Sequence, residues 1–118
     1  MDAIRSAREV LEDHLRLAAA GDIDTDLARN FSEDVVLLTG YGIFRGLEGV
    51  REKAQLLATQ MPGGRWTYRT ILVEGEFGFL EWSGQAQNGA RVEDGADSYL
   101  IREGRIRAMT IHYTVLPP

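Results

Sequence analysis

Asp97 is the residue in this chain that is best placed to do acid–base chemistry. It lies inside a strand-like and largely apolar run, from Asp94 to Val115, that Glu103-Gly104 interrupts. A carboxylate in such a run is either a surface residue on an exposed sheet face or the polar centre of a pocket. In an apolar pocket, desolvation raises the carboxyl pKa, and the group can then donate or accept a proton near neutral pH. The alternative is a structural carboxylate, in a salt bridge or bonded to backbone groups.

His14 is the second candidate for proton transfer, because the pKa of an imidazole lies near neutrality. It lies on an apolar stripe at helical spacing rather than on the charged face of the same segment. The other members of this stripe are Ile4, Ala7, Leu11, Leu15 and Ala18. His14 is therefore either a core histidine with a backbone partner or a donor or acid–base group in a pocket.

The turn after the Asp97 strand decides which residues surround Asp97. A two-residue loop at Glu103-Gly104 would place Asp97 opposite Thr110, on the His112 face. A three-residue loop that starts at Arg102 would place Asp97 on the face of Met109, Ile111 and Tyr113. One residue of slip moves every side chain to the other face of a strand. We favour the three-residue loop, because glycine suits its last, left-handed position. His112 then points away from Asp97, at the surface or in a dimer interface.

The remaining patterns predict helices first and strands later. Asp2 and Gly21 would bound a first helix over 2–20, and a short helix would run from Asp22 to about Asn30. Residues 32–34 read as a turn and 35–39 as a buried strand. A glycine-rich connection over 40–46, with a short strand at Ile43-Phe44, leads to a helix over 47–60 that Pro62-Gly63-Gly64 ends. Four strands follow, over 66–73, 77–87, 91–102 and 105–115, with Asn88-Gly89 as the strongest hairpin signal.

This order predicts one α+β domain over residues 1–118, in which a curved antiparallel sheet wraps on helices. A strongly curved sheet leaves a cavity at its open end, where a small ligand would bind.

Composition excludes several classes of function. The net charge of −5 argues against nucleic acid as a partner, and the absence of cysteine excludes thiolate metal sites and cysteine nucleophiles. No stretch has the length of a membrane span, and 2–16 is too charged for a signal-peptide core. Asp22, Asp24 and Asp26 lack the glycine and the distal glutamate of a calcium loop. We therefore expect a cytoplasmic protein without cofactor or metal, and without a membrane or nucleic-acid partner.

Four segments carry a resemblance to a known family. They are Ala20–Ile23, Phe31–Val36, Phe44–Arg51 and Gly95–Ile106. In these segments, and over nearly all of its length, the chain resembles the SnoaL-like small proteins of the nuclear transport factor 2-like superfamily. The resemblance implies a cystatin-like α+β cone, with a curved antiparallel sheet, three helices, an inner pocket and a homodimer through the outer face of the sheet. Function does not follow from it, because the superfamily mixes isomerases, cyclases, hydrolases, dehydratases and binding modules.

The resemblance also implies roles for single residues. His14 falls where the related ketosteroid isomerases place an oxyanion-hole tyrosine, and Asp97 where they place a protonated aspartate. SnoaL-type polyketide cyclases are similar in keeping an acid–base aspartate at the Asp97 position. Thr39 stands where the isomerases have their general base. Ile111 stands near the second carboxylate of limonene epoxide hydrolases. Both known routes therefore lack a group that they need.

The sequence thus predicts catalytic residues Asp97 and His14 in a pocket for a small hydrophobic molecule, cyclic or polyketide-like. The expected pocket wall comprises Thr39, Tyr41, Trp82, Tyr99, Met109, Ile111 and Tyr113. Three functions compete: a cofactor-free acid–base enzyme, a non-catalytic ligand-binding module, and a dimerisation domain with a solid interior. A pocket with Asp97 in reach of His14 or a tyrosine hydroxyl, with space beside them, would favour the enzyme.

Overall fold

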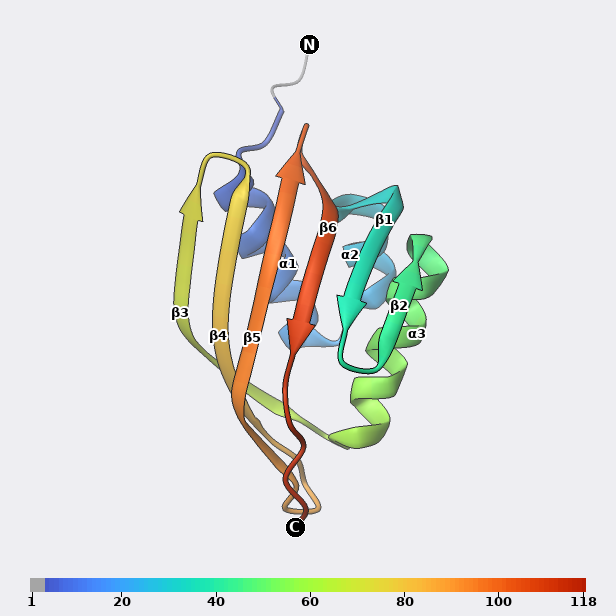
Figure 1. Ribbon diagram of the computed structural model, residues 1–118, viewed down its shortest axis with the longest axis vertical. Helices are drawn as coiled ribbons and strands as arrows, with labels where there is room; N and C mark the ends of the chain where they lie inside the picture. Colours follow the sequence, from blue (N-terminus) through green and yellow to red (C-terminus); the bar gives the residue numbers. More distant parts are fainter. Residues whose placement is uncertain (1–3) are drawn as a thin grey trace.

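Three helices cover one face of a six-stranded sheet in the computed structural model, which describes residues 4–118 (Figure 1). The helices are α1 (Ala7–Ala20), α2 (Ile23–Asn30) and α3 (Gly46–Gln60). The strands are β1 (Phe31–Thr39), β2 (Gly42–Arg45), β3 (Arg65–Glu74), β4 (Phe77–Gln85), β5 (Arg91–Arg102) and β6 (Arg105–His112). This arrangement confirms the predicted α+β architecture.

The first helix begins later than the sequence pattern predicted. Residues 4–6 are not helical, and α1 starts at Ala7. Ser6 caps it: the Glu9 N–H donates to Ser6 Oγ (3.1 Å), and the Ser6 N–H donates to Glu9 Oε1 (3.0 Å). This reciprocal pair is a capping box, which satisfies two otherwise unpaired N–H groups. The predicted cap, Asp2, lies outside the described residues. Gly21 ends the helix as expected, with a φ of 72°.

The sheet has the strand order β2-β1-β6-β5-β4-β3. Every neighbouring pair is antiparallel except β1 and β6, which run parallel. Because α3 and the β3-β4-β5 meander separate these two strands in the chain, no local turn signal could indicate their pairing. The β1–β6 pair joins the N-terminal hairpin to the meander.

The turn predicted at residues 32–34 is wrong, because these residues belong to β1. Glu33 and Asp34 are exposed, and this local polarity suggested a turn. Phe31 and Val35 on either side are buried. The pairing with β6 is irregular between Phe31 and Val36, so this part of the strand is bulged rather than reversed.

The turn between β5 and β6 is also different from the favoured one. Arg102 pairs with Arg105, so the loop is the two-residue Glu103-Gly104, and both residues have positive φ, 55° and 76°. However, the register shifts directly afterwards: Ile101 pairs with Ile106, and Leu100 with Ala108. Arg107 is therefore an extra residue in β6, and such a bulge reverses the facing of all later residues. As a result Asp97 pairs with Ile111, on the face that we predicted, although the loop itself was wrong.

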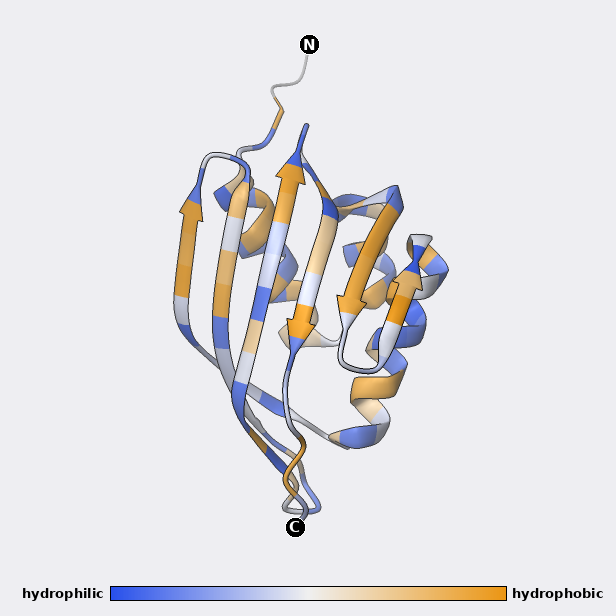
Figure 2. Ribbon diagram, in the orientation of Figure 1, coloured by the Kyte–Doolittle hydropathy of each residue, from blue (hydrophilic) through white to orange (hydrophobic). Residues whose placement is uncertain are grey.

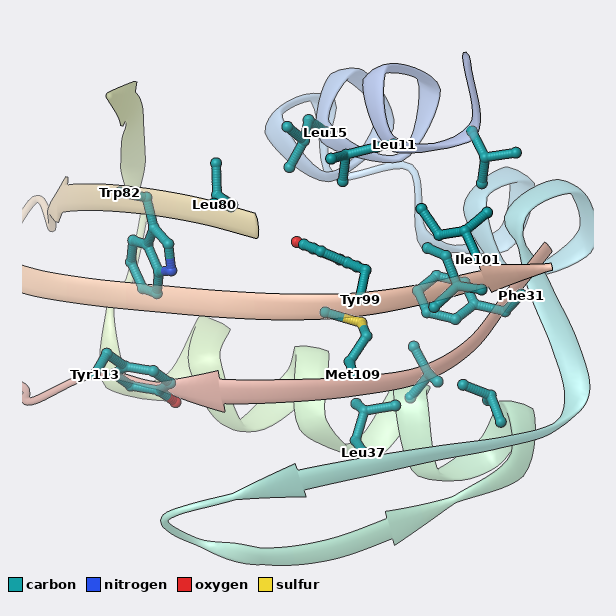
Figure 3. Close-up of a cluster of buried hydrophobic side chains, with 14 of the residues drawn as sticks. Leu11, Leu15, Phe31, Leu37, Leu80, Trp82, Tyr99, Ile101, Met109 and Tyr113 are labelled. Carbon is teal, nitrogen blue, oxygen red and sulfur yellow. The ribbon is translucent and has the colours of Figure 1, made fainter. Parts of the chain in front are cut away.

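The core lies between the helices and the inner face of the sheet. Figure 3 shows Leu11 and Leu15 of α1 opposite Leu80 and Tyr99 of the sheet. Colouring by hydropathy shows a hydrophilic segment in the middle of β5, between more hydrophobic stretches (Figure 2). This middle segment contains Asp97, which is 8% exposed. The fold therefore buries this carboxyl among apolar side chains.

Candidate functional site

A cavity of about 520 Å³ separates the helices from the inner face of the sheet. Cavities of this size hold small organic ligands in proteins. Its wall is largely apolar and takes residues from all three helices and from the sheet. Apolar members of this wall include Leu15, Leu37, Leu57, Met61, Leu80 and Met109. The polar groups in the wall are few, and Asp97, His14 and Lys53 are among them.

The Asp97 carboxylate accepts two hydrogen bonds from aromatic side chains. Trp82 Nε1–H donates to Oδ1 (3.1 Å), and the Tyr99 hydroxyl donates to Oδ2 over a longer 3.4 Å. Trp82 comes from the neighbouring strand β4 and Tyr99 from the same face of β5, which strand alternation requires. Figure 3 shows the Trp82 ring and the Tyr99 side chain projecting from the sheet. Asp97 is thus held in place by two donors and has no salt bridge among residues 4–118.

Burial raises the pKa of Asp97 from 3.8 to about 6. The Trp82 hydrogen bond and the charges of His14 and Lys53 act in the opposite direction, as does the Tyr99 hydrogen bond. Desolvation outweighs them because the carboxyl has lost nearly all of its contact with water. At neutral pH this group is mostly ionised and is a stronger base than a surface aspartate.

His14 lines the same cavity, but its hydrogen bond goes to another carboxylate. Its Nδ1 lies 2.7 Å from Asp26 Oδ2, and Asn30 Nδ2 donates to the other oxygen of Asp26 (2.9 Å). The imidazole packs edge-on against Phe31 and Tyr99. Among the described residues, its Nε2 has no hydrogen-bond partner. Asp26 orients the ring, and His14 does not bond directly to Asp97.

Sequence reasoning placed Asp26 only in a rejected calcium loop. In the structure Asp26 is only 2% exposed, lies four residues before Asn30, and is the hydrogen-bond partner of His14. A signal was available, because a helix capped by Asp22 places Asp26 one turn further along α2. The contact between Asp26 of α2 and His14 of α1 could not be predicted from residue spacing, because it depends on how the two helices pack.

Lys53 was missed entirely. It lies on the inner face of α3 and is only 3% exposed. Its Nζ donates to the Tyr113 hydroxyl (2.8 Å), and Tyr113 donates in turn to Gln60 Oε1. Lys53 stands three residues after Val50 and four before Leu57, a helical spacing that is a local signal for its inward position.

The structure gathers six of the nine predicted site residues around the cavity and leaves three outside its wall. Thr39 does not line the cavity, because its hydroxyl serves the β1–β2 turn: it donates to the Gly42 carbonyl and accepts from the Tyr41 N–H. Tyr41 is 45% exposed and Tyr113 packs beside Trp82, and neither tyrosine lines the cavity. The six that line it are His14, Trp82, Asp97, Tyr99, Met109 and Ile111.

Residues 4–118 contain neither a metal-type side-chain cluster nor a membrane-spanning helix. No group of three or more His, Asp or Glu side chains gathers there as a metal site would require. None of the helices in this range is long and apolar enough to cross a membrane.

The chain is similar to a known domain family over most of its length. The model of the SnoaL-like domain matches residues 11–109, which contain Asp97 and the cavity-lining faces of all three helices. The chain belongs to the SnoaL-like domain family. This confirms the resemblance seen in the sequence. Among curated proteins, no sequence matches the chain significantly.

Solved structures share the fold of this SnoaL-like chain at low sequence identity. A protein from Mesorhizobium loti, named as a candidate SnoaL-like polyketide cyclase, is 20% identical with a TM-score of 0.70, over 92% of this chain and 100% of the other. A candidate ketosteroid isomerase from Kribbella flavida is 15% identical with a TM-score of 0.76, over 95% and 82%. A de novo designed protein with a curved β-sheet is 23% identical with a TM-score of 0.76, over 92% and 84%. At these identities the likeness establishes the fold alone.

Proposed function

We propose that this SnoaL-like protein is a cofactor-free acid–base enzyme that binds a small apolar molecule in the cavity. Asp97 transfers the proton, in a reaction of the isomerase, cyclase, dehydratase or hydrolase type. The observation that carries the proposal is a buried carboxyl, without a salt-bridge partner, in the wall of a largely apolar cavity of about 520 Å³. Structural carboxylates are usually paired, whereas a general base needs a pKa near the working pH and an open space beside it.

The geometry supports a definite role for each neighbour of Asp97. The Trp82 and Tyr99 donors fix the carboxylate plane, so that an oxygen lone pair is available to a bound C–H or O–H group. The apolar wall leaves Asp97 only 8% exposed, and this desolvation keeps the carboxylate more basic than a surface aspartate. Asp97 would take a proton from the substrate in one step and return it at another position in the next. His14, oriented by Asp26, is the proposed second acid–base or donor group.

The names of the structural relatives are compatible with this proposal. A candidate polyketide cyclase and a candidate ketosteroid isomerase both imply apolar, cyclic molecules and proton transfer. Thr39 ends β1 outside the cavity wall and offers no carboxylate there. We therefore infer that Asp97 itself, rather than a residue at position 39, is the proton acceptor in this chain.

Ring opening of 5-nitrobenzisoxazole tests the proposal without knowledge of the natural substrate. This apolar compound opens to a coloured phenolate when a base removes its ring C–H proton. We expect saturable catalysis that rises with pH through about 6, because only the ionised Asp97 acts as a base. Asp97→Asn should lower the rate by roughly 100-fold or more, the usual contribution of a positioned base.

Asp94→Asn is the matched control for this experiment. Asp94 lies on the same strand but is exposed, and its carboxylate binds the Thr114 N–H and hydroxyl at 2.8 Å each. Its rate should equal that of the unmodified protein. Full activity in Asp97→Asn would contradict the proposal, and binding of the compound without any turnover would favour a ligand-binding module instead.

A further inference from the structure

Lys53 is the only lysine of the chain. The chain has 13 lysine and arginine residues in total, and all of them except Lys53 are arginines. Those arginines are distributed over the surface, and many pair with carboxylates, as Arg29 does with Asp13 and Arg102 with Glu76. Among the described residues, Lys53 is the one buried cationic side chain, and it lines the cavity.

The side chain of Lys53 lines the cavity, and its amine makes one hydrogen bond, to Tyr113, above whose ring Nζ lies at 4.6 Å from the centroid. Because the Tyr113 hydroxyl donates its own proton to Gln60, it accepts from Lys53 and does not occupy the nitrogen lone pair. No carboxylate lies within salt-bridge distance of Nζ among residues 4–118, and Asp97 acts on it only at longer range. When the amine is neutral, its lone pair is therefore free of any partner in the fold.

A lysine differs from an arginine at such a site in one chemical respect. Arginine stays protonated inside proteins, whereas a buried lysine loses its proton readily and becomes a nucleophile. Burial lowers the pKa of Lys53 to about 8, and the charge of Asp97 partly opposes this effect. A fraction of the amine is thus neutral at physiological pH, far more than for a lysine in water.

We propose that Lys53 is a nucleophile that forms a reversible imine with the carbonyl carbon of an apolar aldehyde or ketone in the cavity. This inference rests on the proposed function, because it uses the same cavity and the same Asp97. It names the class of ligand that the cavity takes: an apolar molecule that carries an unhindered carbonyl group.

The chemistry balances with groups that line the cavity. The neutral Nζ attacks the carbonyl carbon, a C–N bond forms, and the π electrons of the C=O bond move to oxygen. Asp97 accepts a proton from the nitrogen and delivers it to the alkoxide oxygen, which becomes a hydroxyl group. Asp97 then accepts the second proton of the nitrogen and gives it to this hydroxyl, the C–O bond breaks, and water leaves as the C=N bond forms. The net change is amine plus carbonyl to imine plus water, without an oxidant or a reductant.

Reductive trapping tests this inference on the native protein. We would incubate the folded chain with 2-naphthaldehyde and sodium cyanoborohydride near pH 7 and map the adduct by peptide mass spectrometry. Because Lys53 is the only lysine, an ε-amine adduct can arise at one position, and the peptide map separates it from the N-terminal amine. We expect about one adduct per chain at Lys53, at a rate at least tenfold above that in the urea-unfolded chain.

Two variants sharpen the result. Lys53→Met keeps the side-chain length without the amine and should show label at the N-terminus alone. Asp97→Asn, which leaves the amine in place, should slow labelling of Lys53 by at least tenfold, since it removes the proton carrier. An unlabelled Lys53 in the native protein would overturn the inference, as would labelling no faster than in the unfolded chain or unaffected by Asp97→Asn. Opening of 5-nitrobenzisoxazole needs no amine, so that assay reports separately on the proposed function.

Discussion

Asp97 is a site at which the fold gives up stability. Folding moves its carboxyl from water into a cavity wall, where two aromatic donors and distant positive charges only partly replace the lost hydration. Its pKa rises from 3.8 to about 6 as a result. Such a cost is typical of a group that is kept for its chemistry rather than for packing.

This cost predicts a pH-dependent effect of Asp97→Asn on stability. Because folding raises the carboxyl pKa, the protonated form favours the folded state in full below pH 4, and this advantage is lost as pH rises through about 6. The shift corresponds to roughly 3 kcal/mol at 1.36 kcal/mol per pKa unit. Asparagine never ionises and can still accept from Trp82. Its free energy of unfolding should therefore exceed that of the unmodified protein by up to about this amount at pH 8.

Urea denaturation at pH 4 and pH 8 would measure the difference. Asp94→Asn should behave in the opposite way, because hydrogen bonds from Thr114 lower the pKa of the exposed Asp94. Equal effects of Asp97→Asn at both pH values would show that burial does not perturb this carboxyl.

At the scale of elements, the β5–β6 hairpin decides what Asp97 faces. A two-residue turn alone would turn Asp97 toward Thr110, and the bulge at Arg107 corrects the facing by one residue. Arg107 Nε is the one buried side-chain nitrogen without a hydrogen-bond partner among residues 4–118. The loop and the bulge together place Met109 and Ile111 on the cavity side.

The turn offers a direct test of this geometry. Glu103 and Gly104 both have positive φ, a type I′ pattern that asparagine and glycine adopt most readily. Glu103→Asn should raise the free energy of unfolding by about 0.5–1 kcal/mol, and Gly104→Ala should lower it by about 1–2 kcal/mol. Thermal or urea unfolding would measure both. The reverse order of the two effects would show that the loop is not the two-residue turn.

The sequence predicts those features of the fold whose signals lie within a few residues of each other in the chain. The end of α1, the Asp22-capped helix and the Asn88-Gly89 hairpin follow from residues close in the chain, and all three were predicted. The Ser6–Glu9 capping box was equally local but was overlooked in favour of Asp2. The parallel β1–β6 pair and the Arg107 bulge depend on contacts between distant segments, which periodicity does not contain.

At the scale of the whole molecule, the outer face of the sheet has no helix over it (Figure 1). It carries large apolar side chains that are well exposed, notably Leu72 (59%) and Phe77 (67%). Leu72 pairs with Phe79 across β3 and β4, and Phe77 lies two residues before Phe79 on the same strand. Leu72 and Phe77 therefore share one face of the sheet. We propose that two copies of the chain pack through this face, since apolar patches of this kind are typical of protein interfaces.

Light scattering coupled to size-exclusion chromatography would test the homodimer. We expect a mass of two chains for the unmodified protein and of one chain for the double variant Leu72→Glu/Phe77→Glu, because buried charge disfavours the interface. Ile4→Glu is the matched control, since Ile4 is equally exposed (70%) but lies before α1 and near Gly104. A monomer at all concentrations, or a dimer that survives the double variant, would contradict the proposal.

The candidate site shows what a sequence can and cannot reveal about a cavity. Asp97 and His14 could be selected because carboxylates and histidines on apolar faces are rare. The wall was harder to predict, because Thr39 ends β1 and Tyr41 lies in the turn that follows, and only the three-dimensional path of β1 and β2 places them outside the cavity. Lys53 lies at helical spacing from the apolar Val50 and Leu57, yet a single lysine among arginines gives no signal until burial is known.

The most direct test of the account is a carboxyl ¹³C NMR titration of the folded protein, with Asp97→Asn used to assign the Asp97 resonance. We expect the Asp97 carboxyl to titrate with a midpoint of about 6, well above the 3.8 of an unperturbed aspartate, and an apolar ligand in the cavity to shift this midpoint further. A midpoint at or below 3.8, unchanged by such a ligand, would mean that Asp97 is an ordinary structural carboxylate and would contradict its role as the acid–base group.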